Sequence, residues 1–187
     1  KALSLELFAT GIPDAQYLAG LISAPEEMSR EEIQVWAETA NYWMISEHPV
    51  AWVASEGNYA IELATTWIDS PEEKIASCGW ASLAAFVSIR SNEEIDFALI
   101  DKLLDRAKSE MAAENRNRVR YTMNGFIIAV GSYCPSMTEK CIAIGEVLGT
   151  LKIKLAGAGC KVPFAPEYIK KAIARGTDQK KRKSPRC

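Results

Sequence analysis

Metal-binding and disulfide-forming residues are scarce in this sequence. It has one histidine and no Cys-x-x-Cys pair, and its five cysteines are widely separated, at positions 78, 134, 141, 160 and 187. This is not the spacing of a zinc site, and an odd, scattered set of cysteines is not a disulfide framework. We therefore expect neither a metal ion nor a cofactor, and we expect a reduced, cytoplasmic protein.

Long apolar runs and alternating strand patterns are also missing. No segment approaches the ~20 consecutive apolar residues of a membrane span, and the first residues lack a basic-then-apolar signal pattern. Residues 1–10 have the pattern of the middle of an amphipathic helix, so we expect further sequence upstream. Almost every segment has the helical period. The sequence therefore predicts an all-α protein with no membrane segment.

Basic residues are scarce in the first half of the chain. Residues 1–94 contain 4 Lys/Arg and 15 Asp/Glu, a net charge of −11, whereas residues 95–187 contain 18 and 9, a net charge of +9. A nearly neutral chain with one strongly basic end suits a polyanionic partner that contacts this end. The alternative is a polar helical surface followed by a solvated basic tail, and charge alone leaves both open.

Helix-capping and helix-breaking residues divide the chain into short helices. A capping box, Ser29-Arg-Glu-Glu32, begins one of them, and proline or glycine residues end most of the others. Two further helices are expected at 117–133 and 138–148. In the short helix near residues 15–23, the bulky apolar side chains are expected to face inward, namely Tyr17, Leu18, Leu21 and Ile22.

The expected helices form pairs, at residues 29–54, 58–89, 92–133 and 138–175. Two-helix repeats of this kind favour an α-α superhelix of the HEAT-like or armadillo type, which stacks into a curve with a concave binding face. A compact helical bundle is the competing architecture. We expect one superhelical domain over residues 1–176 and a flexible basic tail over residues 177–187, where no apolar face occurs.

Aromatic residues and an acid gather in one stretch, residues 36–52, which holds three of the five tryptophans and the only histidine. Trp43 and Glu47 stand four residues apart, so on a helix their side chains share one face. An aromatic side chain beside a carboxylate suits a ligand that is cationic or becomes cationic during a reaction. The alternative is structural, because tryptophans at helical spacing are usually core residues and a glutamate near a helix end is usually solvated.

Two parts of the sequence resemble a known family. The segment that runs from Trp36 to Trp43-Met-Ile-Ser-Glu47 is similar to the part of the DNA alkylation repair family that carries a Trp-(x3)-Asp pair. Members of this family are AlkD-like DNA glycosylases built of HEAT-like repeats. The segments 118–132, 159–163 and 168–171 are similar to the C-terminal repeats of one branch of the family. The resemblance covers nearly the whole chain and implies the same HEAT-like α-α superhelix.

The resemblance implies a monomer that acts on duplex DNA and hydrolyses the N-glycosidic bond of cationic N3- or N7-alkylated purines. By position, Trp43 matches the family tryptophan and Glu47 matches the catalytic aspartate. A cationic base leaves readily, and a carboxylate can stabilise the positive charge that develops on the sugar. The family's phosphate-binding arginines match Cys78-Gly79-Trp80 here, and only Phe126 offers an aromatic ring near the position of a second family tryptophan.

Basic residues near the C-terminal end are candidates for contacts with the DNA backbone. Arginines open the helix expected at 117–133, and their charges oppose the helix dipole, which is easier to understand if a phosphate binds there. Contacts with phosphates would be independent of base sequence and would weaken with salt. The candidates are Arg116, Arg118, Arg120, Lys161, Lys180, Lys181, Arg182 and Lys183.

Two other classes of function stay open at this point. The chain could be a family member that binds DNA, or a protein partner, without base excision. It could also be a protein-interaction scaffold whose concave face accepts a peptide or a helix.

Overall fold

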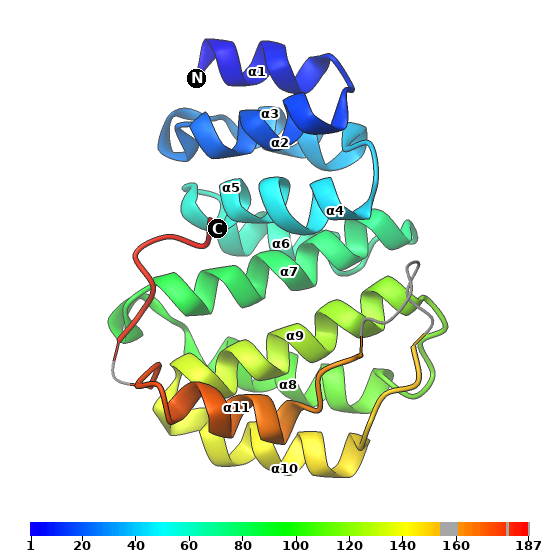
Figure 1. The fold of residues 1–187 in the computed structure, drawn as a ribbon, viewed down its shortest axis with the longest axis vertical. Helices are drawn as coiled ribbons and strands as arrows, with labels where there is room; N and C mark the ends of the chain where they lie inside the picture. The colour runs from blue at the N-terminus through cyan, green and yellow to red at the C-terminus, as the bar shows by residue number, and fades with distance from the viewer. Residues whose placement is uncertain (154–160, 179, 187) are drawn as a thin grey trace. The chain divides into compact units, whose positions relative to one another are not determined.

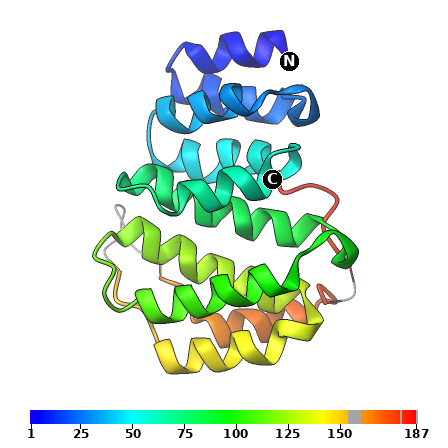
Figure 2. The same cartoon turned by 180° about the vertical axis from the view of Figure 1, so that it is seen from behind.

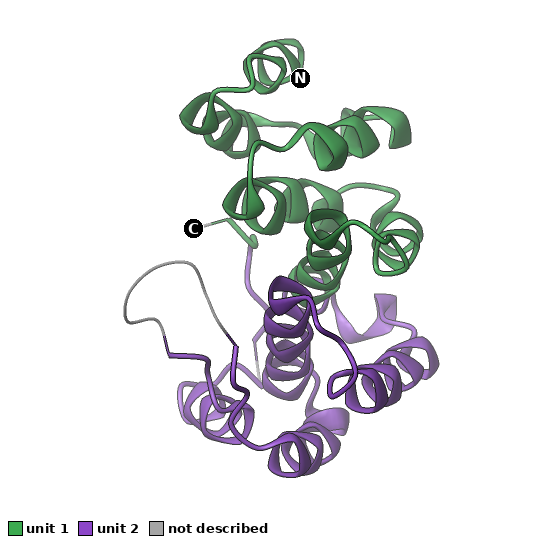
Figure 3. Cartoon of the chain, turned by 90° about the vertical axis from the view of Figure 1, so that its right-hand side faces the viewer, with its two compact units in different colours: residues 1–86, 184–187 green, residues 87–183 purple. Residues whose placement is uncertain are grey.

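The computed structural model describes residues 1–153, 161–178 and 180–186, and all regular secondary structure in these ranges is helical. The chain divides into two compact units (Figure 3). Unit 1 contains residues 1–86 together with 184–187, and unit 2 contains residues 87–183. The single domain expected over residues 1–176 stays a prediction. No helix in the described ranges is long and apolar enough to span a membrane.

Unit 1 is built of short helices joined by tight turns (Figure 1). In chain order they are α1 (Ala2–Ala9), α2 (Pro13–Ile22), α3 (Arg30–Thr39), α4 (Trp43–Ile45), α5 (Ala51–Glu56), α6 (Ala60–Trp67) and most of α7 (Glu73–Ile89). The predicted capping box is present at the start of α3, where the Glu32 backbone N–H donates to Ser29 Oγ (3.2 Å) and the Ser29 N–H donates to Glu32 Oε2 (2.7 Å). This local prediction is confirmed.

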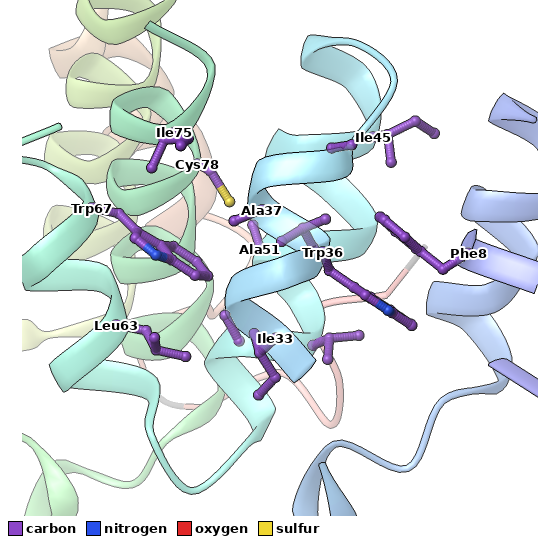
Figure 4. Close-up of a cluster of buried hydrophobic side chains, with 14 of the residues drawn as sticks. Phe8, Ile33, Trp36, Ala37, Ile45, Ala51, Leu63, Trp67, Ile75 and Cys78 are labelled. Carbon is purple, nitrogen blue, oxygen red and sulfur yellow. The ribbon is translucent and has the colours of Figure 1, made fainter. Parts of the chain in front are cut away.

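The core of unit 1 contains aromatic and aliphatic side chains from α1, α3, α6 and α7 (Figure 4). Phe8 and Trp36 stack with ring centroids 4.1 Å apart and planes within 7°. Trp67 is buried, and its indole N–H donates to Gln34 Oε1 at 2.6 Å. Burial of side chains of this size supplies most of the stabilisation of such a core, at roughly 25 cal/mol per Å² of apolar surface.

The prediction for the buried face of α2 is wrong for three of its four residues, whereas Tyr17 is partly buried against the core as expected. Its bulky apolar side chains Leu18, Leu21 and Ile22 are exposed, and its buried residues are Gln16, Ala19 and Gly20. The helix approaches the chain at Pro49 so closely that a Cβ at Gly20 would lie 2.5 Å from Pro49 Cβ. A small-residue face permits this approach, so residue size outweighed hydrophobicity in deciding which face is buried.

Gln16 fixes the same face of α2 through hydrogen bonds. Its Nε2 donates to the carbonyl oxygens of Phe8 (3.2 Å) and Thr39 (3.1 Å), and its Oε1 accepts from the Asn41 N–H (2.9 Å). These hydrogen bonds offset the cost of removing the Gln16 amide from water. These bonds join residues up to 25 positions apart, so the pattern within α2 alone could not indicate them.

The described residues of unit 2 form four main helices and two short 3-10 turns, in addition to the end of α7 (Figure 2). The helices are α8 (Phe97–Glu110), α9 (Asn117–Tyr133), α10 (Thr138–Leu148) and α11 (Ala165–Ile173), and the turns cover Asn92–Glu94 and Pro135–Met137. The bounds of α9 and α10 agree with the prediction. Helices α9, α10 and α11 meet at Gly131, where an added Cβ would lie 2.8 Å from Cys141 Cβ and 2.6 Å from Ile169 Cδ1.

In the C-terminal segment the described residues 180–186 form no helix, but they contact the folded units. In unit 2, Lys181 Nζ donates to the Val87 carbonyl (2.9 Å). In unit 1, Arg186 Nε donates to Glu56 Oε2 (2.8 Å). The expectation of a flexible tail overlooked these contacts, because the partners lie 94 and 130 positions away in sequence.

Candidate nucleic-acid interface

Trp43 and Glu47 lie on consecutive turns in unit 1. Trp43 begins α4, and Glu47 lies in the π-helical turn Ser46–Val50 that follows it. Pro49 sits inside this turn and has no N–H to donate. The chain accommodates it by a wider turn, in which the Ala51 N–H donates to the Ser46 carbonyl five residues back. Single π turns of this kind occur frequently at functional sites.

Most of the aromatic side chains in the 36–52 stretch serve the core. Trp36 and Trp52 are buried, and Trp52 meets Tyr17 edge-on with centroids 5.6 Å apart. Trp43 is half-buried, and the exposed Tyr42 ring lies edge-on to it at 6.0 Å. The structural interpretation therefore holds for two of the three tryptophans, and Trp43 is the indole of this stretch that a ligand could reach.

The Glu47 side chain is 7% exposed and lies within electrostatic range of α7. Burial raises the pKa of the Cys78 thiol, and the negative charge of Glu47 raises it further. Lys74, which donates to the Glu38 and Ala40 carbonyls at 2.9 and 2.8 Å, acts on the same thiol in the opposite sense. A carboxylate in this setting feels a low dielectric and would act strongly on a nearby cation.

The positions that match the family's arginines lie in the core of unit 1. Cys78, Gly79 and Trp80 are all buried. A Cβ at Gly79 would lie 2.8 Å from both the Ala64 carbonyl oxygen and the Ile68 nitrogen, at the C-terminal end of α6. No side chain fits there without displacing α6, so these positions cannot supply a phosphate contact. Phe126 is likewise fully buried.

The arginine at the start of α9 already has an internal anion. Arg116 Nη2 lies 2.6 Å from Glu114 Oε2, and its backbone N–H donates to Glu114 Oε1 at 2.8 Å. The Arg116 guanidinium holds the pKa of Glu114 below its usual range. Glu114 therefore balances the charge of Arg116, and this arginine no longer argues for a bound phosphate.

The other basic residues of this region gather around the first half of α9. Arg120 Nη1 donates to the Lys152 carbonyl (3.2 Å), and Asn124 Nδ2 donates to the Pro163 carbonyl (2.9 Å). The chain on both sides of the undescribed residues 154–160 thus runs beside α9, which brings the exposed Lys161 to this end. Arg118 lies over the Tyr121 ring, 4.7 Å from its centroid.

Lys180–Lys183 lie at the other end of α9. Lys181 Nζ is 3.8 Å from Sγ of Cys134, the residue that directly follows this helix. Burial lowers the pKa of Lys181, whose ammonium serves a structural contact, whereas Lys180, Arg182 and Lys183 are exposed. Since α9 has 17 residues, its ends are ~25 Å apart. The predicted DNA-binding residues therefore form two sets at opposite ends of one helix.

Further basic residues lie between these two sets, and the sequence interpretation missed one of them, Arg175. Lys171 and Arg175 are exposed and line a groove against the second half of α9, together with Tyr168. Their spacing of three and four residues places them on one face of a helix. That spacing was visible in the sequence, but the pairing of α11 with α9 was not. Together with the two sets at its ends, Lys171 and Arg175 extend the basic side chains along the length of α9.

Comparison with known proteins identifies the class. No family model matches the chain. The alignment with one solved structure covers 100% of this chain and 79% of the solved chain, with a TM-score of 0.89 and 31% sequence identity. That protein is described as a member of "a new family of proteins related to the HEAT-like repeat DNA glycosylases with affinity for branched DNA structures". The uncharacterized proteins Lin0241 of Listeria innocua and Lmo0209 of Listeria monocytogenes are 33% and 32% identical over 174 residues, which are 92% of this chain and 74% of each relative.

The fold is thus that of a HEAT-like helical-repeat protein, as predicted. The chain belongs to the family of proteins related to the HEAT-like repeat DNA glycosylases. The predicted resemblance is confirmed for the fold and for kinship with the HEAT-like repeat DNA glycosylases. Repair of alkylated DNA stays a prediction.

Proposed function

We propose that this protein binds DNA through the basic residues that follow α9, and that it prefers branched DNA to linear duplex. One observation carries the proposal: basic side chains from three separate stretches of sequence, near residues 116–120, 161–175 and 180–183, lie along a single helix. A related protein with 31% identity is described as having affinity for branched DNA, which supports the same partner here.

The charges suit a phosphate backbone more than base recognition. Arg118, Lys161 and Lys183 are partly or fully exposed at the two ends of α9. Phosphate contacts of this type provide affinity that is independent of sequence and falls steeply with salt. Preference for a branched substrate then comes from its shape, because phosphates of two arms approach each other at a junction.

A binding titration tests this proposal. Fluorescence anisotropy would compare a labelled four-way junction with a linear duplex of equal arm sequence, for wild type and for the double variant Arg118→Gln, Lys161→Gln. The matched control is Lys102→Gln, since Lys102 is exposed on the face of α8 opposite its buried residues Ile100 and Leu104.

We expect tighter binding to the junction by wild type, a loss of about tenfold or more in the double variant from two lost phosphate contacts, and little change in the control. Equal loss in the control would mean that only net charge matters. Absence of junction binding by wild type near 50 mM salt would contradict the proposal.

Base excision is a second candidate, favoured by the half-buried Trp43 one turn before the buried Glu47. The carboxylate would stabilise the sugar cation formed as an N3- or N7-alkylated purine leaves. Release of N7-methylguanine from alkylated duplex by wild type, abolished in Glu47→Gln, would support this role. Release unchanged in Glu47→Gln would remove Glu47 from the mechanism, and no release by wild type would leave binding alone.

A further inference from the structure

A groove of about 470 Å³ lies between α9 and α11, which run side by side in unit 2 (Figure 1). One wall is a single face of α9, with residues at helical spacing, and the other is the polar face of α11 and the turn after it. The lining residues are Gly125, Ile128, Ala129, Ser132, Tyr133, Tyr168, Lys171, Ala172 and Arg175. A volume in this range suits a small molecule or one unit of a polymer.

The floor of the groove is open and contains one unsatisfied polar group. Nothing lies within 4 Å of the position where a Cβ at Gly125 would be. The Ser132 side chain is 2% exposed, and its hydroxyl has no hydrogen-bond partner within the described part of the chain. Buried hydroxyls without partners are uncommon in folded proteins, and a ligand in the groove that supplied the missing bond would satisfy this one.

The rim of the groove combines aromatic and cationic groups. Tyr168 is 47% exposed, and Lys171 Nζ lies 5.5 Å from its ring centroid. Lys171 also lies 3.9 Å from Glu167, a pair so exposed that it leaves the ammonium available to another anion. Arg175 is exposed at the far end of the rim. An aromatic face beside two cations matches a base and its phosphates.

The groove continues toward the second set of basic residues. Tyr133 lines both this groove and an adjoining pocket of about 190 Å³ that includes the exposed Lys180 together with Glu93 and Asp178. A strand that enters at Tyr168 therefore has one further available cation, Lys180, for its next phosphate. An acidic peptide would satisfy the cations but would leave the exposed aromatic face of Tyr168 without a role.

We propose that the α9–α11 groove binds one unpaired nucleotide of a DNA strand, with the base on Tyr168, the phosphates at Lys171 and Arg175, and a hydrogen bond to Ser132. This rests on the proposed DNA-binding function and deepens it, because strands can separate where the arms of branched DNA meet. The basic side chains along the rest of α9 hold the phosphates of the duplex arms, and the groove holds the unpaired base.

The decisive variant is Gly125→Leu, which fills the groove from its open floor. Folding is not at risk, since the site is empty and leucine has a higher helix propensity than glycine. Ala143→Leu on the exposed side of α10 adds a similar side chain elsewhere and serves as the control. Tyr168→Leu and Tyr168→Phe separate loss of the ring from loss of its hydroxyl.

Binding of fluorescein-labelled oligothymidylate, linear duplex and four-way junction would be measured by anisotropy for each variant. We expect Gly125→Leu and Tyr168→Leu to weaken oligothymidylate binding about tenfold or more and to leave duplex binding within twofold. Tyr168→Phe and Ala143→Leu should bind like wild type. A crosslink from 5-iodouracil in the oligonucleotide to the 168 peptide would locate the base.

Several results would overturn the inference. Oligothymidylate binding unchanged by Gly125→Leu, with junction binding intact in wild type, would refute the groove and leave the proposed function standing. Equal competition by oligoglutamate would show a general anion site with no place for a base. Failure of wild type to bind any of the three DNAs would overturn both proposals together.

Discussion

The contact between Arg186 and Glu56 makes a quantitative prediction about the C-terminal segment. Arg186 Nη2 and Nε lie 2.6 and 2.8 Å from Glu56 Oε2, and Nη1 donates to the Leu21 carbonyl at 2.7 Å. Both charged side chains are about one-fifth exposed. Charge-assisted hydrogen bonds contribute ~1.5–3 kcal/mol each and do not add fully, so Arg186→Ala should destabilise unit 1 by about 2–4 kcal/mol.

All five tryptophans lie before residue 87, so their fluorescence reports unit 1 alone. Urea unfolding followed at the tryptophan emission should show a midpoint about 1 M or more lower for Arg186→Ala than for wild type, given a slope of ~1–3 kcal/mol per M. Lys183→Ala, which removes an exposed charge in the same segment, should change the free energy of unfolding by less than ~0.5 kcal/mol.

A double-mutant cycle with Glu56→Gln tests whether the two side chains act on each other. If they do, the effects of Arg186→Ala and Glu56→Gln should be non-additive by about 1–3 kcal/mol. Arg186→Ala with the stability of wild type and no coupling to Glu56 would refute the docked segment and restore the free tail that the sequence suggested.

Three further predictions concern stability and reactivity. The arginine partner of Glu114 lowers its pKa, so its contribution to folding stability is present above the unfolded pKa of ~4.3 and is lost as pH falls through the folded pKa. Glu114→Gln should therefore lower the melting temperature at pH 7 and make the melting temperature fall less steeply toward pH 3. A melting temperature lowered by the same amount at every pH would contradict this. Burial raises the pKa of Cys141 to about 12, so iodoacetamide should modify it slowly in the native protein and rapidly in urea, as peptide mass spectrometry would show; fast native labelling would count against its burial. Gly79→Ala should destabilise the protein by at least ~1 kcal/mol because its Cβ would meet the Ala64 carbonyl, whereas Gly125→Ala should be neutral or stabilising by up to ~1 kcal/mol in thermal melts, and the reverse order would refute the packing.

Local signals in the sequence were sufficient for most helix boundaries. The box at Ser29–Glu32 and the prolines near residues 135 and 166 act within one turn, so their effect can be read without knowing the fold. The buried face of α2 could not be read this way. It depends on how closely Gly20 approaches Pro49, and hydrophobicity alone favoured the opposite face.

The candidate site was predictable only in part, for a related reason. The four-residue spacing of Trp43 and Glu47 is local, and the structure keeps them on consecutive turns. The partners that decide which basic side chains are available are distant, as with Lys181 and the Val87 carbonyl. The groove needs Ser132 and Lys171 from two helices separated by a long connection, so no single stretch of sequence contains it.

The most direct test of the central claim is the salt dependence of four-way-junction binding. If phosphates contact the basic residues along α9, the logarithm of the association constant should fall linearly with the logarithm of the salt concentration, and the slope should shrink by about 0.9 for each contact removed. The double variant Arg118→Gln, Lys161→Gln should therefore lower the slope by nearly two, with Lys102→Gln unchanged. An identical slope for wild type and double variant would contradict the account.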